Sequence, residues 1–450
     1  MRKLFGTDGI RGVANVFPMD VQTAVAAGKA IAHYFKVRSG LHAKHVVIGQ
    51  DTRRSGDMLA QAVAAGACAA GADVWMLGVL PTPGIACLAR STGALAGIVI
   101  SASHNPFEDN GIKVFDGNGY KLSDEGESAL EELILGSDTI PAAGPKEIGH
   151  VTSVSDAKDR YLTFLLKSTG APALSQLSVV LDCANGATYQ TAPQLFAQLG
   201  ADAFPLYCAP NGFNINDQCG SQHPEETARM VVSRNADVGM AFDGDGDRLI
   251  AVDETGRVLS GDQIMAVCAK DLMLKGALKS KKMVSTVMSN MGFGIALKQM
   301  GITLHTSQVG DRYVMEEMRR EGAVFGGEDS GHIIFNDVHT TGDGLMAALR
   351  LLDAMQSSGK PLSELSRVMQ VYPQVLINVD VKSKPDIENV PEIMDAIARA
   401  EKTLADRGRV LVRYSGTQNK CRIMVEGPTA EQTQALCAQM AEVVRKIIGT

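Results

Sequence analysis

Hydrophobic and polar positions follow one another in blocks along this chain. Short apolar runs rich in β-branched residues lead into polar turns, and longer segments with the apolar spacing of a helix come next. This order is typical of α/β units whose successive strands lie parallel. The pattern therefore predicts an α/β protein.

Three segments share this plan closely. Each reads as a strand, a polar turn and the start of a helix: HVVIGQDTRRSG (45–56), SVVLDCANGAT (178–188) and KMVSTVMSNMGFG (282–294). The likeness lies in the pattern and not in identical residues. It favours three related α/β domains.

Breaks in the pattern predict where the domains end. A polar stretch at 144–160 separates the first unit from the second, and the strand RLIAVDE (248–254) closes the second. The helix PLSELSRVM (361–369) closes the third. The remainder reads strand–helix–strand–strand–helix, which suits a smaller α+β domain with an antiparallel sheet. We predict domains at 1–155, 156–255, 256–370 and 371–450.

Length and composition narrow the class of protein. A chain of 450 residues is too long for a single core, and 45% hydrophobic with 21% charged residues is ordinary for a soluble protein. The net charge of -7 argues against a nucleic-acid surface. Eight cysteines without a C-x-x-C pair indicate reduced thiols. The start MRKLFGTDGIRG lacks the apolar core of a signal peptide, and no apolar run approaches the ~18 residues of a membrane helix. We expect a cytoplasmic protein without a membrane partner.

The strongest local signal is the segment MAFDGDGDRLIAVDE. Asp243, Asp245 and Asp247 alternate with glycine, and carboxylates this close repel one another unless a cation lies among them. Hard oxygen ligands suit Mg²⁺ or Ca²⁺ and not zinc. The segment predicts a metal site on a loop between two strands.

An EF-hand or a solvated acidic turn fits this segment less well. An EF-hand would place Glu254 at its twelfth position, but its sixth position needs glycine and this chain has Arg248. The residues on both sides also read as strands and not as the helices of an EF-hand. A merely solvated acidic turn is disfavoured because those flanking residues are apolar.

A second signal is LAGIVISASHNPFEDNGIKVF. An apolar strand leads to Ser103, His104 and Asn105, a placement that suits a nucleophile whose neighbours bind a phosphoryl group. A serine at a strand end is more often a turn residue or a cap. No G-x-S-x-G elbow occurs, which argues against a serine hydrolase of that type. Lys113, which follows in NGIK, can supply charge or a proton.

A third signal is RVLVRYSGTQNKCRIMVEG. Its donors form a credible cradle for an anion: Arg413, Ser415, Gly416, Thr417 and, on the next strand, Arg422. An ordinary hairpin with surface arginines is the alternative. The chain contains no Walker loop.

A fourth signal is FGGEDSGHIIF. Glu328 and Ser330 occupy a glycine-lined loop that suits sugar hydroxyls or an amine, and His332 opens the next strand. A lone histidine at a strand start more often has a structural role.

Together these four segments resemble the α-D-phosphohexomutase superfamily over essentially the whole chain. The matching motifs follow the order S-A-S-H-N-P, D-G-D-G-D-R, G-E-x-S-G-H and R-x-S-G-T. The resemblance implies three related α/β domains and a C-terminal α+β domain around a central cleft. It also implies that one loop from each domain meets in that cleft.

The resemblance also implies roles for individual residues. Ser103 would be the phosphoserine, with His104 beside it, and a phosphoserine oxygen would join Asp243, Asp245 and Asp247 in holding one Mg²⁺. Glu328 and Ser330 would hold the sugar. The residues implied to hold the non-reacting phosphate are Arg413, Ser415, Gly416 and Thr417, with Arg422 nearby. Those implied to orient groups or move protons are Arg11, Lys113, Arg248 and His332.

Four further segments point to the branch of the superfamily that acts on glucosamine phosphates: LFGTDGIRG (4–12), NGFNINDQCGSQHPE (211–225), VGDRYV (309–314) and TTGDG (340–344). That branch implies interconversion of the 6- and 1-phosphates through glucosamine 1,6-bisphosphate, in the supply of cell-wall precursors. A mannose or glucose phosphate mutase with the same mechanism, a phosphoserine-dependent phosphatase and a silent sugar-phosphate-binding protein stay open, as does a homodimer.

This chain departs from the family pattern in two places. Gln418-Asn419 stands where the family has Glu-Pro after R-x-S-G-T, which puts the stiffness of that loop in doubt. Asp329 stands in the sugar loop where amides are frequent, and its charge would favour an amino sugar.

Overall fold

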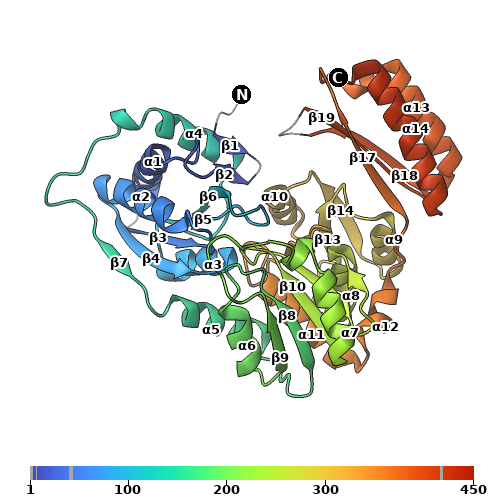
Figure 1. The fold of residues 1–450 in the computed structure, drawn as a ribbon, viewed down its shortest axis with the longest axis horizontal. Helices are drawn as coiled ribbons and strands as arrows, with labels where there is room; N and C mark the ends of the chain where they lie inside the picture. The colour runs from blue at the N-terminus through green and yellow to red at the C-terminus, as the bar shows by residue number, and fades with distance from the viewer. Residues whose placement is uncertain (1–3, 7, 40–43, 416–418) are drawn as a thin grey trace. The chain divides into compact units, whose positions relative to one another are not determined.

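The computed structural model describes residues 4–6, 8–39, 44–415 and 419–450. The chain forms two compact units, one from residues up to 287 together with 302–367, the other from 288–301 and 368–450. Figure 1 shows the elements of both units, and each unit is described by itself below.

The first sheet of the larger unit has seven strands. Their order is β1 (Phe5–Gly6), β2 (Gly9–Val13), β6 (Asp109–Asp116), β5 (Ala96–Ile100), β3 (His45–Gln50), β4 (Asp73–Val79) and β7 (Val151–Ser153). Alternate strand residues such as Val46, Ile48 and Ile98 join a core with three helices. These are α1 (Val21–Ser39), α2 (Gly56–Ala69) and α4 (Asp124–Leu135). Helix α3 (Thr82–Thr92) packs on the opposite face, where Ile85 abuts Gly49 (Figure 1).

Two smaller sheets complete this unit. The second has the order β12 (Val258–Leu259), β11 (Leu249–Asp253), β10 (Val238–Phe242), β8 (Ser178–Asp182) and β9 (Asp202–Leu206). The third has the order β14 (Thr303–Ser307), β13 (Lys282–Thr286), β15 (Phe325–Gly327) and β16 (Ile333–Phe335). Their helices are α5 (Ala157–Thr169), α6 (Thr191–Gln198), α7 (Glu225–Arg234), α8 (Gly261–Leu274), α10 (Asp311–Glu321), α11 (Gly344–Ser358) and α12 (Leu362–Leu365).

The smaller unit contains a three-stranded antiparallel sheet with the order β17 (Gln374–Asp380), β19 (Lys420–Glu426) and β18 (Arg409–Tyr414). Helices α13 (Pro391–Leu404) and α14 (Ala430–Ile448) bury Ile393, Leu404 and Val444 in a core with Ile423 and Val425 of the sheet. Helix α9 (Met291–Gln299) also belongs to this unit. The predicted strand–helix–strand–strand–helix order and its antiparallel sheet are confirmed.

Each of the four sheets presents a motif of the sequence on a loop between two antiparallel neighbours. The serine segment joins β5 to β6, the aspartates join β10 to β11, and the segment with Glu328 joins β15 to β16. The segment after Arg413 joins β18 to β19. In the first three sheets the strand before the loop also pairs with a parallel strand. That strand is therefore fixed inside the sheet, and the loop begins at its carboxyl end.

The predicted α/β class is confirmed, and the three predicted strand–turn–helix units appear as β3–α2, β8–α6 and β13–α9. The sheets are mixed and not purely parallel. The four predicted boundaries stay predictions. Among the described residues, no helix has both the length and the apolar character needed to cross a membrane.

Asp343 provides a test of how burial affects the stability of this fold. It caps α11, where its Oδ1 accepts the Met346 N–H at 3.0 Å and its Oδ2 accepts the Tyr161 hydroxyl at 2.9 Å. Burial raises the pKa of Asp343 to about 7. Because the folded-state pKa is raised above the ordinary ~3.9, this residue's contribution to stability is lost as the pH rises through 7.

Asp343→Asn keeps a side chain that caps helices well but removes this titration. We expect the melting temperature of the variant, relative to the parent, to rise between about pH 4 and pH 7 and then to level off. Thermal melts across this range measure the difference. A difference that stays constant with pH would contradict the prediction.

Candidate active site

Ser103 lies buried at the end of β5 in a strained conformation. Its φ of 54° is in the left-handed region, which non-glycine residues adopt only when the surroundings hold them there. The Ser103 N–H donates to Ser101 Oγ at 2.9 Å, and the Ser103 hydroxyl donates to Asp243 Oδ2 at 2.7 Å. The serine is therefore aimed at the aspartate loop of the second sheet.

A buried arginine holds this serine loop from behind. Arg53 Nη2 donates to the carbonyls of Ser103 at 2.9 Å and Asn105 at 2.8 Å, and its Nη1 donates to those of Pro106 and Asp109. Its Nε pairs with Asp51 Oδ2 at 2.8 Å. The sequence pattern did not reveal this role of Arg53 and Asp51, although both stand in the polar turn after β3.

The aspartate loop lies against the serine loop. Gly244 approaches so closely that a Cβ on it would lie 2.5 Å from the Ser103 carbonyl oxygen, so this position requires glycine. Gly246 has a φ of 72°, which glycine adopts without strain. The two glycines thus allow the loop to turn and to meet Ser103.

The three aspartates of this loop are buried, and one oxygen from each lies within 4.8 Å of the others. Asp245 Oδ1 and Asp247 Oδ1 are buried without a hydrogen-bond partner. Burial and the negative charges of Asp247 and Asp245 raise the pKa of Asp243 well above its ordinary value. Two oxygens without a hydrogen-bond donor in a set of repelling carboxylates suit a hard divalent cation, so the loop can hold a metal ion.

Permanent positive charge surrounds these carboxylates. Lys113 Nζ lies 2.8 Å from Asp245 Oδ2, 3.1 Å from Asp8 Oδ2 and 3.7 Å from Asp247 Oδ2. Burial alone would lower the pKa of Lys113, but these three carboxylates raise it well above its ordinary value. Lys113 is therefore a fixed cation at neutral pH. Thr82 of α3 also donates to Asp245 Oδ2, at 2.6 Å.

Two arginines and a histidine complete the surroundings of Ser103. Arg11 donates to the Ala102 carbonyl at 3.2 Å, and Arg248 Nε lies 3.7 Å from Asp247 Oδ1. His104 Nδ1 lies 3.3 Å from Ser103 Oγ. Burial and the charges of Arg248 and Arg11 lower the pKa of His104 to about 4, so its ring is neutral at physiological pH.

The loop of the third sheet reaches the same place through His332. Its Nδ1 lies 3.5 Å from Asp247 Oδ2, while its Nε2 accepts the Gly342 N–H at 3.0 Å. Glu328 Oε1 accepts the Gly310 N–H at 3.0 Å, and burial raises the pKa of Glu328. Ser330 Oγ is buried without a hydrogen-bond partner. The loop therefore presents a carboxyl group and a hydroxyl group beside the metal loop.

The contacts of Asp329 are with the start of helix α8. Its Oδ1 accepts the Asp262 N–H at 3.4 Å and its carbonyl accepts the Gly261 N–H at 2.9 Å, both at the start of α8. The carboxylate lies at the positive end of a helix, where it is stabilised. The hydrogen bond therefore lends no support to the prediction that Asp329 favours an amino sugar.

The fourth predicted loop belongs to the smaller unit. Arg413 of β18 and Arg422 of β19 stand directly opposite in the register, and the Nε atoms of both are buried without a hydrogen-bond partner. Burial and the Arg422 charge lower the pKa of Arg413. Like charges in this position destabilise a sheet unless an anion lies between them. Lys384 donates to the Ser415 carbonyl at 2.8 Å. Gly416, Thr417 and Gln418 lie outside the described residues.

The larger unit thus brings together most of the predicted site: Arg11, Ser103, His104, Lys113, Asp243, Asp245, Asp247, Arg248, Glu328, Ser330 and His332. Besides Arg53 and Asp51, it adds three residues that the sequence pattern did not single out. Asp8 pairs with Lys113 and Lys121, and Lys121 also pairs with Asp311. Asp8 and Asp311 fall within two of the quoted segments, but no local pattern showed that they would meet.

The fold and these contacts define a multidomain α/β protein that presents a serine hydroxyl to a cation-binding loop, an arrangement suited to phosphoryl transfer. Four family models match the chain. They are the phosphoglucomutase/phosphomannomutase α/β/α domains I (residues 2–140), II (159–256) and III (260–372) and the C-terminal domain (376–443). The chain belongs to this family, the phosphohexomutases, and is a mutase of the isomerase class.

The curated relatives narrow the comparison. A phosphoglucosamine mutase from Syntrophobacter fumaroxidans is 54% identical over 452 residues and one from Syntrophus aciditrophicus is 53% identical over 454, each match covering 100% of both chains. The predicted resemblance and the four-domain organisation are confirmed.

Solved structures share the fold. A phosphoglucomutase/phosphomannomutase family protein from Burkholderia thailandensis matches with a TM-score of 0.80 at 24% identity, covering 98% of this chain and 97% of that one. An N-acetylphosphoglucosamine mutase from Aspergillus fumigatus, solved with GlcNAc-6P and magnesium, matches with a TM-score of 0.71 at 17% identity, covering 100% and 96%.

Replacing Arg53 tests whether it holds the serine loop. Arg53→Met leaves Asp51 buried without its partner and frees the loop carbonyls, so we expect a loss of about 3–5 kcal/mol of stability. We also expect kcat to fall about 10- to 100-fold, because Ser103 would lose its alignment. Melting temperature and kcat measure the two effects. The exposed neighbour Arg54→Met is the control and should change neither; equal effects in both variants would refute the role of Arg53.

Asp243→Asn tests the metal loop without measuring activity. Because burial and the neighbouring carboxylates disfavour a charge on Asp243, a neutral asparagine there should cost little stability without a cation. We therefore expect the variant to melt close to the parent in a chelator. A divalent cation should raise the melting temperature of the parent and have little effect on the variant. The exposed Asp217→Asn should behave like the parent. A cation effect that survives in Asp243→Asn would contradict this assignment.

Proposed function

We propose that this enzyme interconverts glucosamine 6-phosphate and glucosamine 1-phosphate through a phosphorylated Ser103 and a glucosamine 1,6-bisphosphate intermediate. The observation that carries the proposal is the strained Ser103, whose hydroxyl lies 2.7 Å from Asp243 in a loop built for a cation. The choice of sugar is supported by relatives named phosphoglucosamine mutase that match the whole chain.

The serine and metal loops act together in this proposal. Asp243, Asp245 and Asp247, with an oxygen of the phosphorylated Ser103, would hold Mg²⁺. When bound, that ion neutralises charge on the phosphoryl group. Arg53 and Asn216 hold the Ser103 carbonyl, each at 2.9 Å, and keep the loop still while the phosphoryl group is transferred. The alignment lowers the entropic part of the barrier.

Fixed charges and one neutral base surround the transfer. A sugar hydroxyl attacks the phosphorus, the bond to Ser103 Oγ breaks, and the hydroxyl proton must leave. Lys113 keeps its own proton at neutral pH, and it serves with Arg11 and Arg248 to stabilise negative charge. His104 is neutral beside Ser103, so its ring can accept the proton. His332, whose Nδ1 lies 3.5 Å from Asp247 Oδ2, orients that aspartate.

The remaining loops hold the sugar. Glu328 and Ser330 bind ring hydroxyls. Arg413, Ser415, Gly416, Thr417 and Arg422 bind the phosphate that is not reacting. The bisphosphate then turns round, so that its other phosphate meets Ser103 and the same cradle binds the opposite end. A cytoplasmic enzyme supplying cell-wall precursors fits this reaction, and assembly as a homodimer is compatible with it.

Turnover of three sugars tests the proposal directly. Glucosamine, mannose and glucose 6-phosphates are supplied with Mg²⁺ and a trace of the matching bisphosphate, and both the isomer and free phosphate are followed. We expect a clear preference for the glucosamine isomer. Preference for another sugar would move the enzyme to a sister function, and free phosphate without isomer would indicate a phosphatase.

Ser103→Ala tests the role of the nucleophile. Without the hydroxyl there is no group to carry the phosphoryl, so we expect mutase activity to fall by about 10⁴-fold or more. The exposed Ser128→Ala on α4 is the matched control and should keep full activity. Appreciable turnover by Ser103→Ala would overturn the mechanism.

A further inference from the structure

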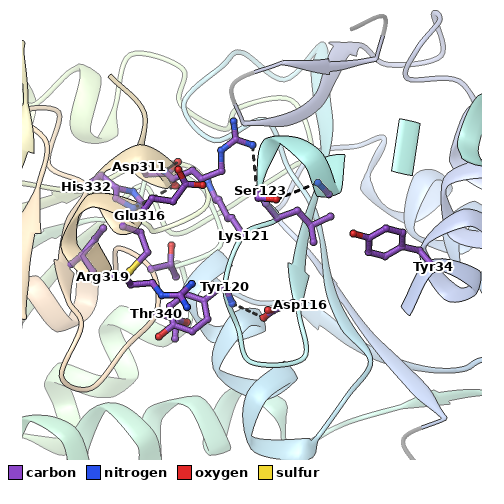
Figure 2. Close-up of a pocket in the computed structure, with 16 residues that line it drawn as sticks. Tyr34, Asp116, Tyr120, Lys121, Ser123, Asp311, Glu316, Arg319, His332 and Thr340 are labelled. Carbon is purple, nitrogen blue, oxygen red and sulfur yellow. Dashed lines mark hydrogen bonds and ion pairs between the residues drawn. The ribbon is translucent and has the colours of Figure 1, made fainter. Parts of the chain in front are cut away.

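The larger unit contains a pocket of about 280 Å³ whose lining includes His332, the residue that contacts Asp247 of the metal loop. It lies between the segment that joins β6 to α4 and the first turns of α10 (Figure 2). Lys121 and Ser123 line it from the former, Asp311, Glu316 and Arg319 from the latter. Its size suits a hexose ring with some water, and the charged and hydroxyl-bearing side chains in its mixed lining suit a hydroxylated or charged ligand.

Asp311 is the acid that links this pocket to the catalytic groups. One of its carboxylate oxygens, one of Asp247 and a nitrogen of His332 all lie within 4.8 Å of one another. The loop that carries it is anchored to the sugar loop, because Gly310 donates to Glu328 Oε1 at 3.0 Å. Asp311 is thus a neighbour of Asp247 in the metal loop, the loop whose Asp243 accepts the Ser103 hydroxyl.

The environment of Asp311 keeps it charged and leaves it room to accept hydrogen bonds. Lys121 pairs with Asp311 Oδ2, and although burial opposes the change, its charge lowers the pKa of Asp311. Its Oδ1 accepts the Arg312 N–H at 2.8 Å and its Oδ2 faces Lys121 and His332. A carboxylate has about four lone-pair sites, so a further donor can bind. Lys121 also pairs with Asp8. If a ligand's ammonium group binds Asp311, Lys121 therefore still has a carboxylate partner.

We propose that Asp311 is the specificity residue that binds the ammonium group of a 2-amino sugar phosphate. This inference rests on the proposed function. The amino group is on the carbon next to the one that bears O1. When O1 faces Ser103, the ammonium therefore lies next to the reacting atoms, where Asp311 stands. A charge-assisted hydrogen bond there favours the amino sugar over one with a hydroxyl at this carbon.

The other acids near the pocket are less suited to this role. Asp116 Oδ1 already accepts the N–H groups of Asn118 and Tyr120, both at 2.9 Å, within its own turn. Glu316 lies more than one helical turn along α10 from Asp311. Asp329 caps α8. Among the carboxylates that line the pocket, Asp311 is the one with an oxygen within 4.8 Å of both Asp247 and His332.

Equilibrium binding tests the inference without requiring turnover. In the full chain carrying Ser103→Ala, calorimetry gives the Kd of glucosamine 6-phosphate and of glucose 6-phosphate. We expect the amino sugar to bind more tightly. Adding Asp311→Asn should weaken glucosamine 6-phosphate about 10- to 100-fold and change glucose 6-phosphate by less than about threefold, as expected for one lost charged hydrogen bond.

Glu316→Gln in the same parent is the matched control, since it makes the same carboxylate-to-amide change in the same helix and pocket. It should preserve the preference for the amino sugar. Equal binding of the two sugars by the parent would overturn the inference without any change at Asp311. An equal loss for both sugars in Asp311→Asn, or a selective loss in Glu316→Gln, would also overturn it. Turnover by the unmodified enzyme decides the proposed function separately.

Discussion

The repulsion among three buried carboxylates is the constraint on which the site depends. Asp243, Asp245 and Asp247 are held within 4.8 Å of one another, in surroundings where uncompensated charge is costly. Lys113 and Arg248 lie at fixed positions beside the carboxylates and offset part of this charge, and two carboxylate oxygens without a hydrogen-bond donor remain for a cation. The same loop receives the Ser103 hydroxyl. The packing of the first sheet against the second therefore sets both the charge balance of the aspartates and the position of the nucleophile.

A repeated architectural device places the chemistry. In each sheet the functional loop joins two antiparallel strands, and in the larger unit the strand before the loop is also paired in parallel inside the sheet. The parallel pairing buries and stiffens the strand, and the turn to the antiparallel neighbour leaves a short loop at the end of that strand. Such loops can change in sequence without disturbing the core, which allows one fold to select among sugars.

Local patterns were sufficient for most elements. The closing helix predicted for the C-terminal segment appears as α14, and the strand–turn–helix units begin at the expected residues, because apolar spacing depends on neighbours in the chain. The four motif loops were also visible, since their glycines and charges are clustered. Arg53, Asp8 and Lys121 were not found as site residues, because each acts on partners more than 50 residues away in at least one contact. Asp329 is a case in which the sequence suggested a role in the site, whereas in the structure its carboxylate accepts a hydrogen bond at the start of α8.

By itself, the amino-acid sequence determined the α/β class, the order of the elements and the types of group available for chemistry. These follow from periodicity and residue chemistry, which act over a few positions. Only the tertiary structure decided which charges meet. It set Ser103 in a left-handed conformation against Asp243, paired Lys121 with both Asp8 and Asp311, and turned Asp329 to a helix end. The physical reason is that electrostatic energies depend on distance and burial in space, and both are set when separate sheets pack together.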